Sequence, residues 1–218
     1  MREFLQAKLA IPEWAEQVST LPQGFAAAMT AISKTIPQTP TLGDRVRVVG
    51  AVSHLEVVAA QWTAVLADDD KTWCCIGLAW FYESLSRWVE AERCCQRALE
   101  ISKTALGDRH PDTASSLNNL AGLYSSQGRY GEAEPLYVEA LEIRKTALGD
   151  RHPDTASSLF NLAAFYYNTQ RHQQALAYIE QALQIYIPTL GNDHPTTQAA
   201  NSWYQGIQQA ITNQQSPS

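Results

Sequence analysis

Hydrophobic residues between positions 114 and 146 recur with the period of an α-helix, in two separate stretches. The first stretch contains Leu117, Leu120, Ala121 and Tyr124, and the second contains Ala133, Leu136, Tyr137, Ala140 and Leu141. This i, i+3, i+4 spacing is typical of amphipathic helices that bury one face. Gly128 lies between the stretches and can take the left-handed conformation that ends a helix. The pattern therefore predicts two helices joined by a tight turn.

This pattern recurs along the chain with a fixed period of 42 residues. Lys103–Leu117 and Lys145–Leu159 share the same fifteen residues, KTALGDRHPDTASSL, and a looser copy, LGNDHPTTQ, begins at Leu190. In the second block Pro153 is expected to start a helix, because Pro is favoured at the first helical position. Asp154 beside it meets the positive end of the helix dipole. A period of this length indicates one helix–turn–helix unit stacked on itself.

Three copies of the unit share one spacing of small, apolar and aromatic residues. The middle copy has Leu117, Leu120, Ala121, Tyr124, Ala133 and Tyr137; the copy before it has Cys75, Leu78, Ala79, Tyr82, Ala91 and Cys95; the copy after it has Leu159, Leu162, Ala163, Tyr166, Ala175 and Ile179. This spacing resembles the tetratricopeptide repeat signature. HEAT repeats lack this Ala/Tyr spacing, and propeller blades need alternating strands that the sequence does not show. We therefore expect an all-α fold, a right-handed α-solenoid of tetratricopeptide helix–turn–helix repeats with N- and C-terminal capping helices.

The unit is longer than the usual tetratricopeptide repeat of about 34 residues. Lys145 stands where the common form often has Pro, so the second helix can continue for a further turn. The longer unit, with LG-x-x-HP-x-x-A between repeats and LNNLA in the first helix, resembles the kinesin light chain repeats over about residues 70–206. The resemblance implies a scaffold that binds proteins. Kinesin light chains bind their heavy chain through long heptads upstream of the repeats, and the prolines before residue 42 argue against such heptads here.

We expect three segments along the chain. Residues 1–67 form an N-terminal helical cap segment, in which Pro12, Pro22, Pro37 and Pro40 divide residues 1–42 into short helices and Val46–Leu66 forms one long helix over the first repeat. Residues 68–211 form the repeat array, at about 70–104, 112–146 and 154–188, with a capping helix at 195–211. The polar residues 212–218 are expected to be disordered. The region from about Val46 to Tyr82 also resembles the segment that joins ATPase modules to repeat arrays in some bacterial signalling proteins, but the chain has no phosphate-binding loop.

The first helices of stacked pairs line a concave face, where we expect a ligand. The side chains predicted to face it are Trp73, Trp80, Glu83, Ser115, Asn118, Asn119, Ser125, Phe160, Asn161, Tyr167 and Asn168. Each Asn offers a donor and an acceptor, which suits the main chain of an extended peptide. The kinesin light chain resemblance implies that Asn119 and Asn161 contact a peptide backbone, and Gly77 departs from this pattern. Trp73, Trp80, Phe160 and Tyr167 are expected to hold apolar side chains.

Structural alternatives exist for the same residues. The Asn side chains could instead bond a neighbouring helix, and the Trp residues could pack under the N-terminal segment. Arg87, Arg129 and Arg171 recur at the turn between the helices and are expected to be solvated, so we predict no carboxylate clamp. His110 and His152, which occupy identical positions before Pro, are predicted to be loop or cap residues.

The remaining chemistry argues against catalysis and metal binding. The sequence has no Ser/His/Asp set with plausible spacing, no His-Glu-x-x-His and no nucleotide-binding glycine loop, so we expect neither an enzyme nor a cofactor. Cys74, Cys75, Cys94 and Cys95 form two doublets rather than Cys-x-x-Cys pairs, which favours packing over zinc binding. Asp68–Asp70 is interpreted as a solvated helix cap rather than a cation site.

The net charge of −6 over 218 residues disfavours a nucleic-acid surface. No apolar run is long enough to span a membrane, and the N-terminus lacks the features of a secretory signal, so we expect a cytoplasmic protein. The leading hypothesis is a non-catalytic scaffold that holds an extended protein or peptide segment in its groove. Two alternatives are a ligand-sensing arm of a bacterial signalling system and a self-assembly module, so the chain is expected to be a monomer or a homodimer through its N-terminal segment.

Overall fold

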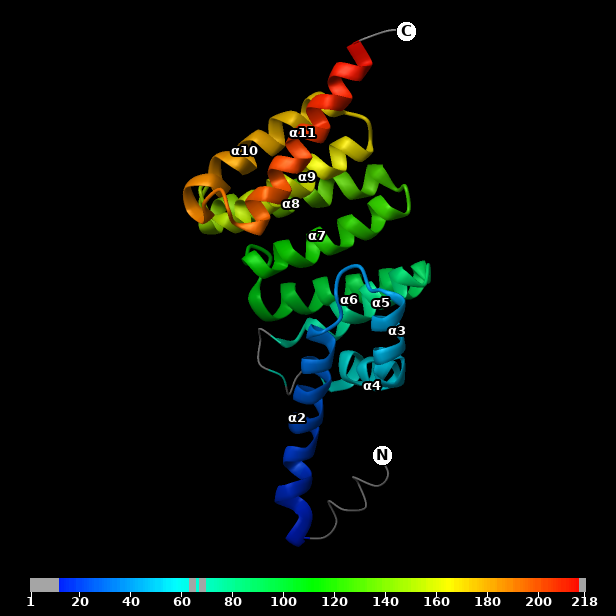
Figure 1. Ribbon diagram of the computed structural model, residues 1–218. Helices are drawn as coiled ribbons and strands as arrows, with labels where there is room; N and C mark the ends of the chain where they lie inside the picture. Colours follow the sequence, from blue (N-terminus) through cyan, green and yellow to red (C-terminus); the bar gives the residue numbers. More distant parts are fainter. Residues whose placement is uncertain (1–11, 63–65, 67–69, 216–218) are drawn as a thin grey trace. The chain divides into compact units, whose positions relative to one another are not determined.

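The computed structural model describes residues 12–62, 66 and 70–215, and every element of secondary structure in these ranges is helical. The chain forms two compact units, Met1–Ala105 and Leu106–Ser218 (Figure 1). None of the described helices is long and apolar enough to cross a membrane. The predicted all-α fold built from helix–turn–helix repeats is confirmed.

The first unit contains a segmented N-terminal region followed by one helical hairpin. Its elements are α2 (Pro12–Lys34), α3 (Leu42–Val48), the 3₁₀ turn η1 (Val49–Ala51), α4 (Val52–Val57), the π-helical segment η2 (Val58–Trp62), α5 (Trp73–Ser84) and α6 (Trp88–Leu106). The prediction of one long helix over Val46–Leu66 is wrong, because η1 and η2 interrupt it. Gly50 and a series of valines lower the intrinsic helix propensity of this stretch.

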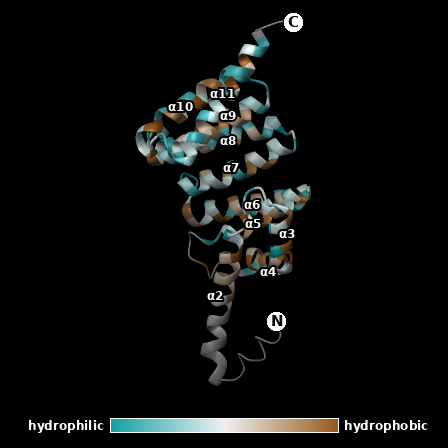
Figure 2. Ribbon diagram, in the orientation of Figure 1, coloured by the Kyte–Doolittle hydropathy of each residue, from teal (hydrophilic) through white to brown (hydrophobic). Residues whose placement is uncertain are grey.

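The second unit consists of two helical hairpins and a final helix. Its elements are α7 (Pro111–Ser126), α8 (Tyr130–Leu148), α9 (Pro153–Asn168), α10 (His172–Leu190) and α11 (Pro195–Gln215). Hydrophobic and hydrophilic colours alternate along these helices, as expected for amphipathic elements (Figure 2). Helix α11 occupies the predicted capping region, but it extends to Gln215, into the segment expected to be disordered. Residues 216–218 lie outside the described residues.

Small residues allow the helices of each hairpin to approach closely. Ala121 on α7 and both Ala133 and Ala140 on α8 are fully buried, while Leu117 and Tyr137 fill the space between them. Hereafter the first helix of a hairpin (α5, α7 or α9) is called helix A and the second (α6, α8 or α10) helix B. The repeating alanines thus set the spacing that brings successive helix A elements together.

Histidine side chains cap the helices that follow the repeated loops. His110 Nδ1 accepts a hydrogen bond from the backbone N–H of Asp112 at 3.2 Å, His152 Nδ1 from that of Asp154 at 3.1 Å, and His194 Nδ1 from that of Thr196 at 3.2 Å. Each cap satisfies an N–H group that would otherwise lack a partner in the first helical turn. The predicted cap role of His110 and His152 is confirmed.

The four cysteines all lie in the core of the first unit as free thiols. Burial raises the pKa of the Cys94 thiol to about 11 and that of Cys75 to about 12. This placement agrees with the packing interpretation of the two doublets. Asp68 and Asp69 of the acidic run lie outside the described residues, and Asp70 forms an ion pair with Lys34.

Candidate functional site

Two asparagines occupy equivalent positions on helix A in the second unit. Asn119 on α7 and Asn161 on α9 are 42 residues apart, and both side chains are half-buried. Neither carboxamide forms a hydrogen bond with another residue that the structure describes. Each therefore retains a donor and an acceptor for a ligand. One turn further along the same faces lie the small residues Gly122 and Ala164, which leave room above the helices.

Asn118 behaves differently from its neighbour Asn119. Its side chain is only 8% exposed, and Nδ2 donates to Ser158 Oγ on α9 at 3.3 Å. Oδ1 is buried without a hydrogen-bond partner. The structure therefore places Asn118 in the bond to a neighbouring helix that the sequence left as an alternative. Ser125 is half-buried and Asn168 is exposed.

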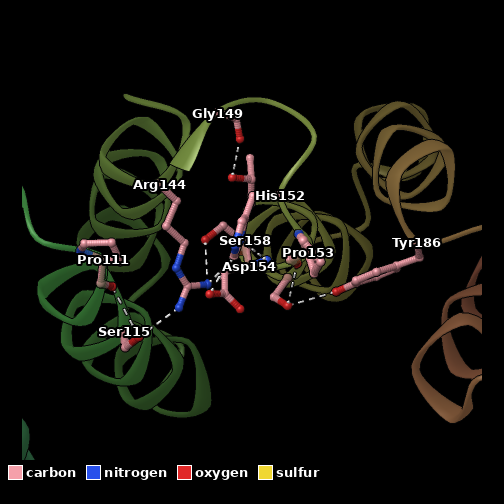
Figure 3. A network of polar contacts seen from close by, with 11 residues as sticks. Pro111, Ser115, Arg144, Gly149, His152, Pro153, Asp154, Ser158 and Tyr186 are labelled. Atoms are coloured by element: carbon pink, nitrogen blue, oxygen red, sulfur yellow. Dashed lines mark hydrogen bonds and ion pairs between the residues drawn. The ribbon is translucent and has the colours of Figure 1, made fainter. Parts of the chain in front are cut away.

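Arg144 on α8 is a site residue that the sequence interpretation missed. Its side chain is 9% exposed and reaches between α7 and α9 (Figure 3). Nη1 donates to the carbonyl oxygen of Asp154 at 3.0 Å and to Ser158 Oγ at 3.1 Å, while Nη2 donates to Ser115 Oγ at 2.8 Å. One helix B residue thus connects the first turns of two helix A elements.

The guanidinium of Arg144 is incompletely compensated. Its hydrogen-bond acceptors are a carbonyl and two hydroxyl oxygens, and within the described residues no carboxylate forms a salt bridge with it. Burial lowers the pKa of this guanidinium, and its Nε is buried without a hydrogen-bond partner. A buried cation with neutral partners attracts an anion more strongly than a solvated one does.

The repeat offers a signal that could have identified Arg144. The positions 42 residues before and after it are Ser102 and Tyr186, so only the middle repeat has a cation there. Tyr186 also points toward helix A, where its hydroxyl donates to Ser157 Oγ at 3.0 Å. A helix B position that changes between repeats and faces helix A is therefore a marker of the site.

Three aromatic residues gather at the end of the second unit formed by α9 and α11. Phe160 and Tyr167, both predicted from the sequence, contact Trp203 edge-on, with ring centroids 5.8 and 5.5 Å apart. Trp203 was missed, although it lies 42 residues after Asn161 and occupies the same repeat position. The series is therefore Gly77, Asn119, Asn161 and Trp203.

The corresponding face of α5 in the first unit is covered by α2. The hydroxyl of Ser33 donates to the carbonyl oxygen of Trp73, and Lys34 Nζ lies 5.9 Å from the Trp73 ring centroid. A Cβ atom on Gly77 would collide with Ser33 Oγ and lie 3.1 Å from the Ser33 carbonyl oxygen. Trp73 thus packs under the N-terminal segment, and its ring contacts that of Trp80 at 6.4 Å. Glu83 is half-buried.

The recurring arginines stack on tyrosines rather than standing free in solvent. The guanidinium carbon lies 4.8 Å from the Tyr82 ring centroid for Arg87, 4.0 Å from that of Tyr124 for Arg129 and 4.4 Å from that of Tyr166 for Arg171. The expectation that these arginines are merely solvated is therefore wrong. Cation–π stacking fixes them at the hairpin turns, where they stabilise the repeat rather than line the candidate site.

Arg171 also connects two hairpins of the second unit. Its Nη1 and Nη2 donate to Glu134 Oε1 and Oε2 at 3.1 and 2.9 Å, and Tyr166 Oη donates to the same carboxylate at 2.8 Å. The hydrogen bond from Arg171 lowers the pKa of Glu134. In the first unit Tyr82 donates in the same way to Glu56 on α4. The N-terminal segment thus supplies a contact that helix B supplies elsewhere.

Comparison with known proteins gives both a family and structural neighbours. The model of the tetratricopeptide repeat family matches residues 68–146, 117–187 and 154–201. A solved Podosopora anserina structure with nearly identical TPR-like repeats, described as a kinesin light chain, has a TM-score of 0.66 and 25% identity, covering 89% of this chain and 90% of that chain. The structure of BtubC (BKLC) from P. vanneervenii has a TM-score of 0.69 and 22% identity, covering 97% and 85%, and bears on the fold alone. A search of curated proteins finds no match.

Proposed function

Because the chain belongs to the tetratricopeptide repeat family, in its 42-residue kinesin light chain-like form, we propose that it is a scaffold that holds an extended segment of a partner protein. The repeat fold itself supports a role in protein interaction. We place the partner segment on the helix A faces of α7, α9 and α11. The observation that carries this proposal is the pair of half-buried carboxamides, Asn119 and Asn161, which lack partners among the described residues.

The spacing of these groups suits a peptide main chain. An extended backbone presents donors and acceptors at regular intervals, and two equivalent Asn side chains can bond it at two points. Such contacts give affinity without dependence on the side chains of the partner. Neighbouring groups then provide selectivity. The first unit contributes less, because α2 already covers Trp73 and Gly77.

The groups on either side of the asparagines favour particular side chains in the partner. Arg144 provides incompletely compensated positive charge beside Ser115, which favours an acidic residue. Trp203, with Phe160 and Tyr167, offers aromatic faces to an apolar residue. We therefore expect a segment that combines acidic and apolar side chains. The proposal involves no catalysis and no cofactor, and the kinesin light chain resemblance supports a cytoplasmic location.

A peptide selection tests this proposal directly. Random peptides selected against the full chain provide ligands whose affinity can be measured by fluorescence anisotropy. We expect the double variant Asn119→Ala/Asn161→Ala to bind them at least tenfold more weakly, since each lost hydrogen bond contributes about 1 kcal/mol. The matched control is Asn192→Ala/Asn213→Ala, which removes two exposed asparagines and should change affinity by less than twofold. Equal affinity of both variants, with helicity intact, contradicts the proposal.

An exposed apolar stripe supports self-assembly as a second candidate function. Leu42, Val46 and Val49 on α3 and η1 are 69%, 66% and 62% exposed. Their spacing places them on one helical face, which is suited to pairing with a second copy. We expect Leu42→Ser/Val46→Ser/Val49→Ser to shift the chain from dimer to monomer in sedimentation velocity at tens of micromolar. Val89→Ser, at an isolated exposed valine, serves as the control. A monomeric wild-type chain rules this candidate out.

A further inference from the structure

A cavity of about 530 Å³ opens in the first unit between the N-terminal segment and the hairpin of α5 and α6. Buried side chains form its floor, and charged side chains lie at its rim. The residues that line it are Glu56, Ala59, Ala60, Cys75, Leu78, Tyr82, Arg93, Cys94 and Arg97. A volume of this size is typical of sites for small molecules. The π-helical segment η2, which contributes Ala59 and Ala60, is of a kind frequently found at functional sites.

The repeats serve as internal references for the floor of this cavity. At the position of Cys75 the other two repeats have Leu117 and Leu159, and at the position of Cys94 they have Leu136 and Tyr178. Both cysteines are smaller than the residues they replace. The hollow therefore lies where the other repeats have larger side chains.

The rim differs from the other repeats in charge. Arg93 corresponds to Pro135 and Ala177, and Arg97 corresponds to Glu139 and Gln181. The two arginines lie four residues apart on α6 and therefore share one face. Arg93 forms no hydrogen bond or ion pair with any residue that the structure describes. Arg97 pairs with the exposed Glu100 at 2.7 Å, an arrangement that contributes little when solvated.

The acidic residue at the rim has a partner of its own. Tyr82 donates its hydroxyl hydrogen to Glu56 across the cavity. The rim therefore presents two guanidinium groups, one of them unpaired within the described residues, above an apolar floor of Cys75, Leu78 and Cys94. Such a combination fits a molecule with an apolar body and a single anionic head, and it lies apart from the helix A faces considered above.

We propose that this cavity binds a small anionic amphiphile, with its apolar body against Cys75, Leu78 and Cys94 and its carboxylate or phosphate group between Arg93 and Arg97. Binding requires no covalent step, and the thiols act only as small apolar surfaces. The proposal is independent of the peptide-binding role.

Calorimetric titration of the full chain with decanoate and with decyl phosphate, both below their micelle concentrations, tests the proposal. We expect saturable binding at one site, and the tighter of the two ligands identifies the head group. Arg93→Ala/Arg97→Ala should weaken binding of either anion at least tenfold while changing binding of neutral decanol by less than twofold. The matched control, Arg109→Ala/Arg151→Ala, removes two exposed loop arginines and should leave affinity within twofold of the wild type.

A second variant tests the floor of the cavity. Cys75→Leu/Cys94→Leu introduces the side chains of the middle repeat and should abolish binding by filling the space. If this variant does not fold, the surface variant Arg93→Ala/Arg97→Ala decides the question alone. Absence of saturable binding to the wild type, or equal affinity in the wild type and Arg93→Ala/Arg97→Ala, overturns the proposal.

Discussion

Helix α5 in the first unit and helices α7 and α9 in the second share one repeat pattern but present different faces. At the same repeat position α5 has Gly77, where α2 lies directly against the backbone, whereas α7 and α9 have Asn119 and Asn161, which lack partners among the described residues. The residue at this position thus varies with what lies against it. A glycine accommodates a segment of the same chain, and an asparagine remains available to another molecule.

Introducing asparagine at the glycine position should have the largest effect on this comparison. In Gly77→Asn the new side chain collides with Ser33 and must displace α2, and overpacking of this kind costs about 3 kcal/mol. We expect a lower midpoint of urea unfolding, followed by circular dichroism. Gly206→Asn is the matched control, because a Cβ atom there meets nothing within 4 Å. Similar midpoints for the two variants would show that α2 does not hold this face.

The cysteines provide a second test, since all four belong to the first unit. Burial raises the pKa of Cys94 from an ordinary 9.0 to about 11, so its thiolate is about a hundredfold scarcer at pH 8. We expect the native chain to react with a disulfide reagent far more slowly than the urea-unfolded chain. Because the folded pKa is raised, this contribution to stability is present below pH 9 and is lost as the pH rises above that value.

The same reaction can report on the first unit alone. Gly77→Asn should accelerate thiol labelling, because displacement of α2 exposes the region around Cys74. A variant that weakens only the second unit should leave the labelling rate unchanged. Acceleration by both kinds of variant would show that the two units unfold together.

Glu134 allows a smaller test within the second unit. Its hydrogen bonds with Arg171 and Tyr166 lower its pKa below the ordinary 4.5, so the stabilisation is present above pH 4.5 and is lost as the pH falls below it. We expect Glu134→Gln to lower the free energy of unfolding by about 1 kcal/mol at pH 7, since the group is a third exposed and partly screened. The difference from the wild type should shrink at pH 3.5. A difference independent of pH would assign the effect to packing.

The sequence predicts the helices well because their determinants are local. The spacing of Leu117, Leu120 and Tyr124 and the caps at His110 and His152 depend on residues within a few positions of one another. The division of the segment over Val46–Leu66 was missed, since the helical period continues through Gly50 while the backbone changes to 3₁₀ and π geometry. Local propensity is a weak guide to such changes.

The candidate site was less predictable because it depends on contacts between distant segments. The sequence showed that Gly77 departs from the repeat, but the reason is Ser33, more than forty residues earlier. Arg144 gains its significance only when Ser115, Asp154 and Ser158 converge on one guanidinium. No local pattern contains this convergence, although comparison of the repeats with one another marks the position.

The loops between hairpins have one further consequence. Gly107, Gly149 and Gly191 adopt nearly the same backbone conformation, with φ of 94°, 91° and 87°. Since the fifteen residues around the first two are identical, deletion of residues 108–149 would rejoin Gly107 to Asp150 and recreate the native sequence across the splice. The number of hairpins can therefore change by recombination without any foreign junction, so that the length of partner segment spanned is adjustable in whole steps.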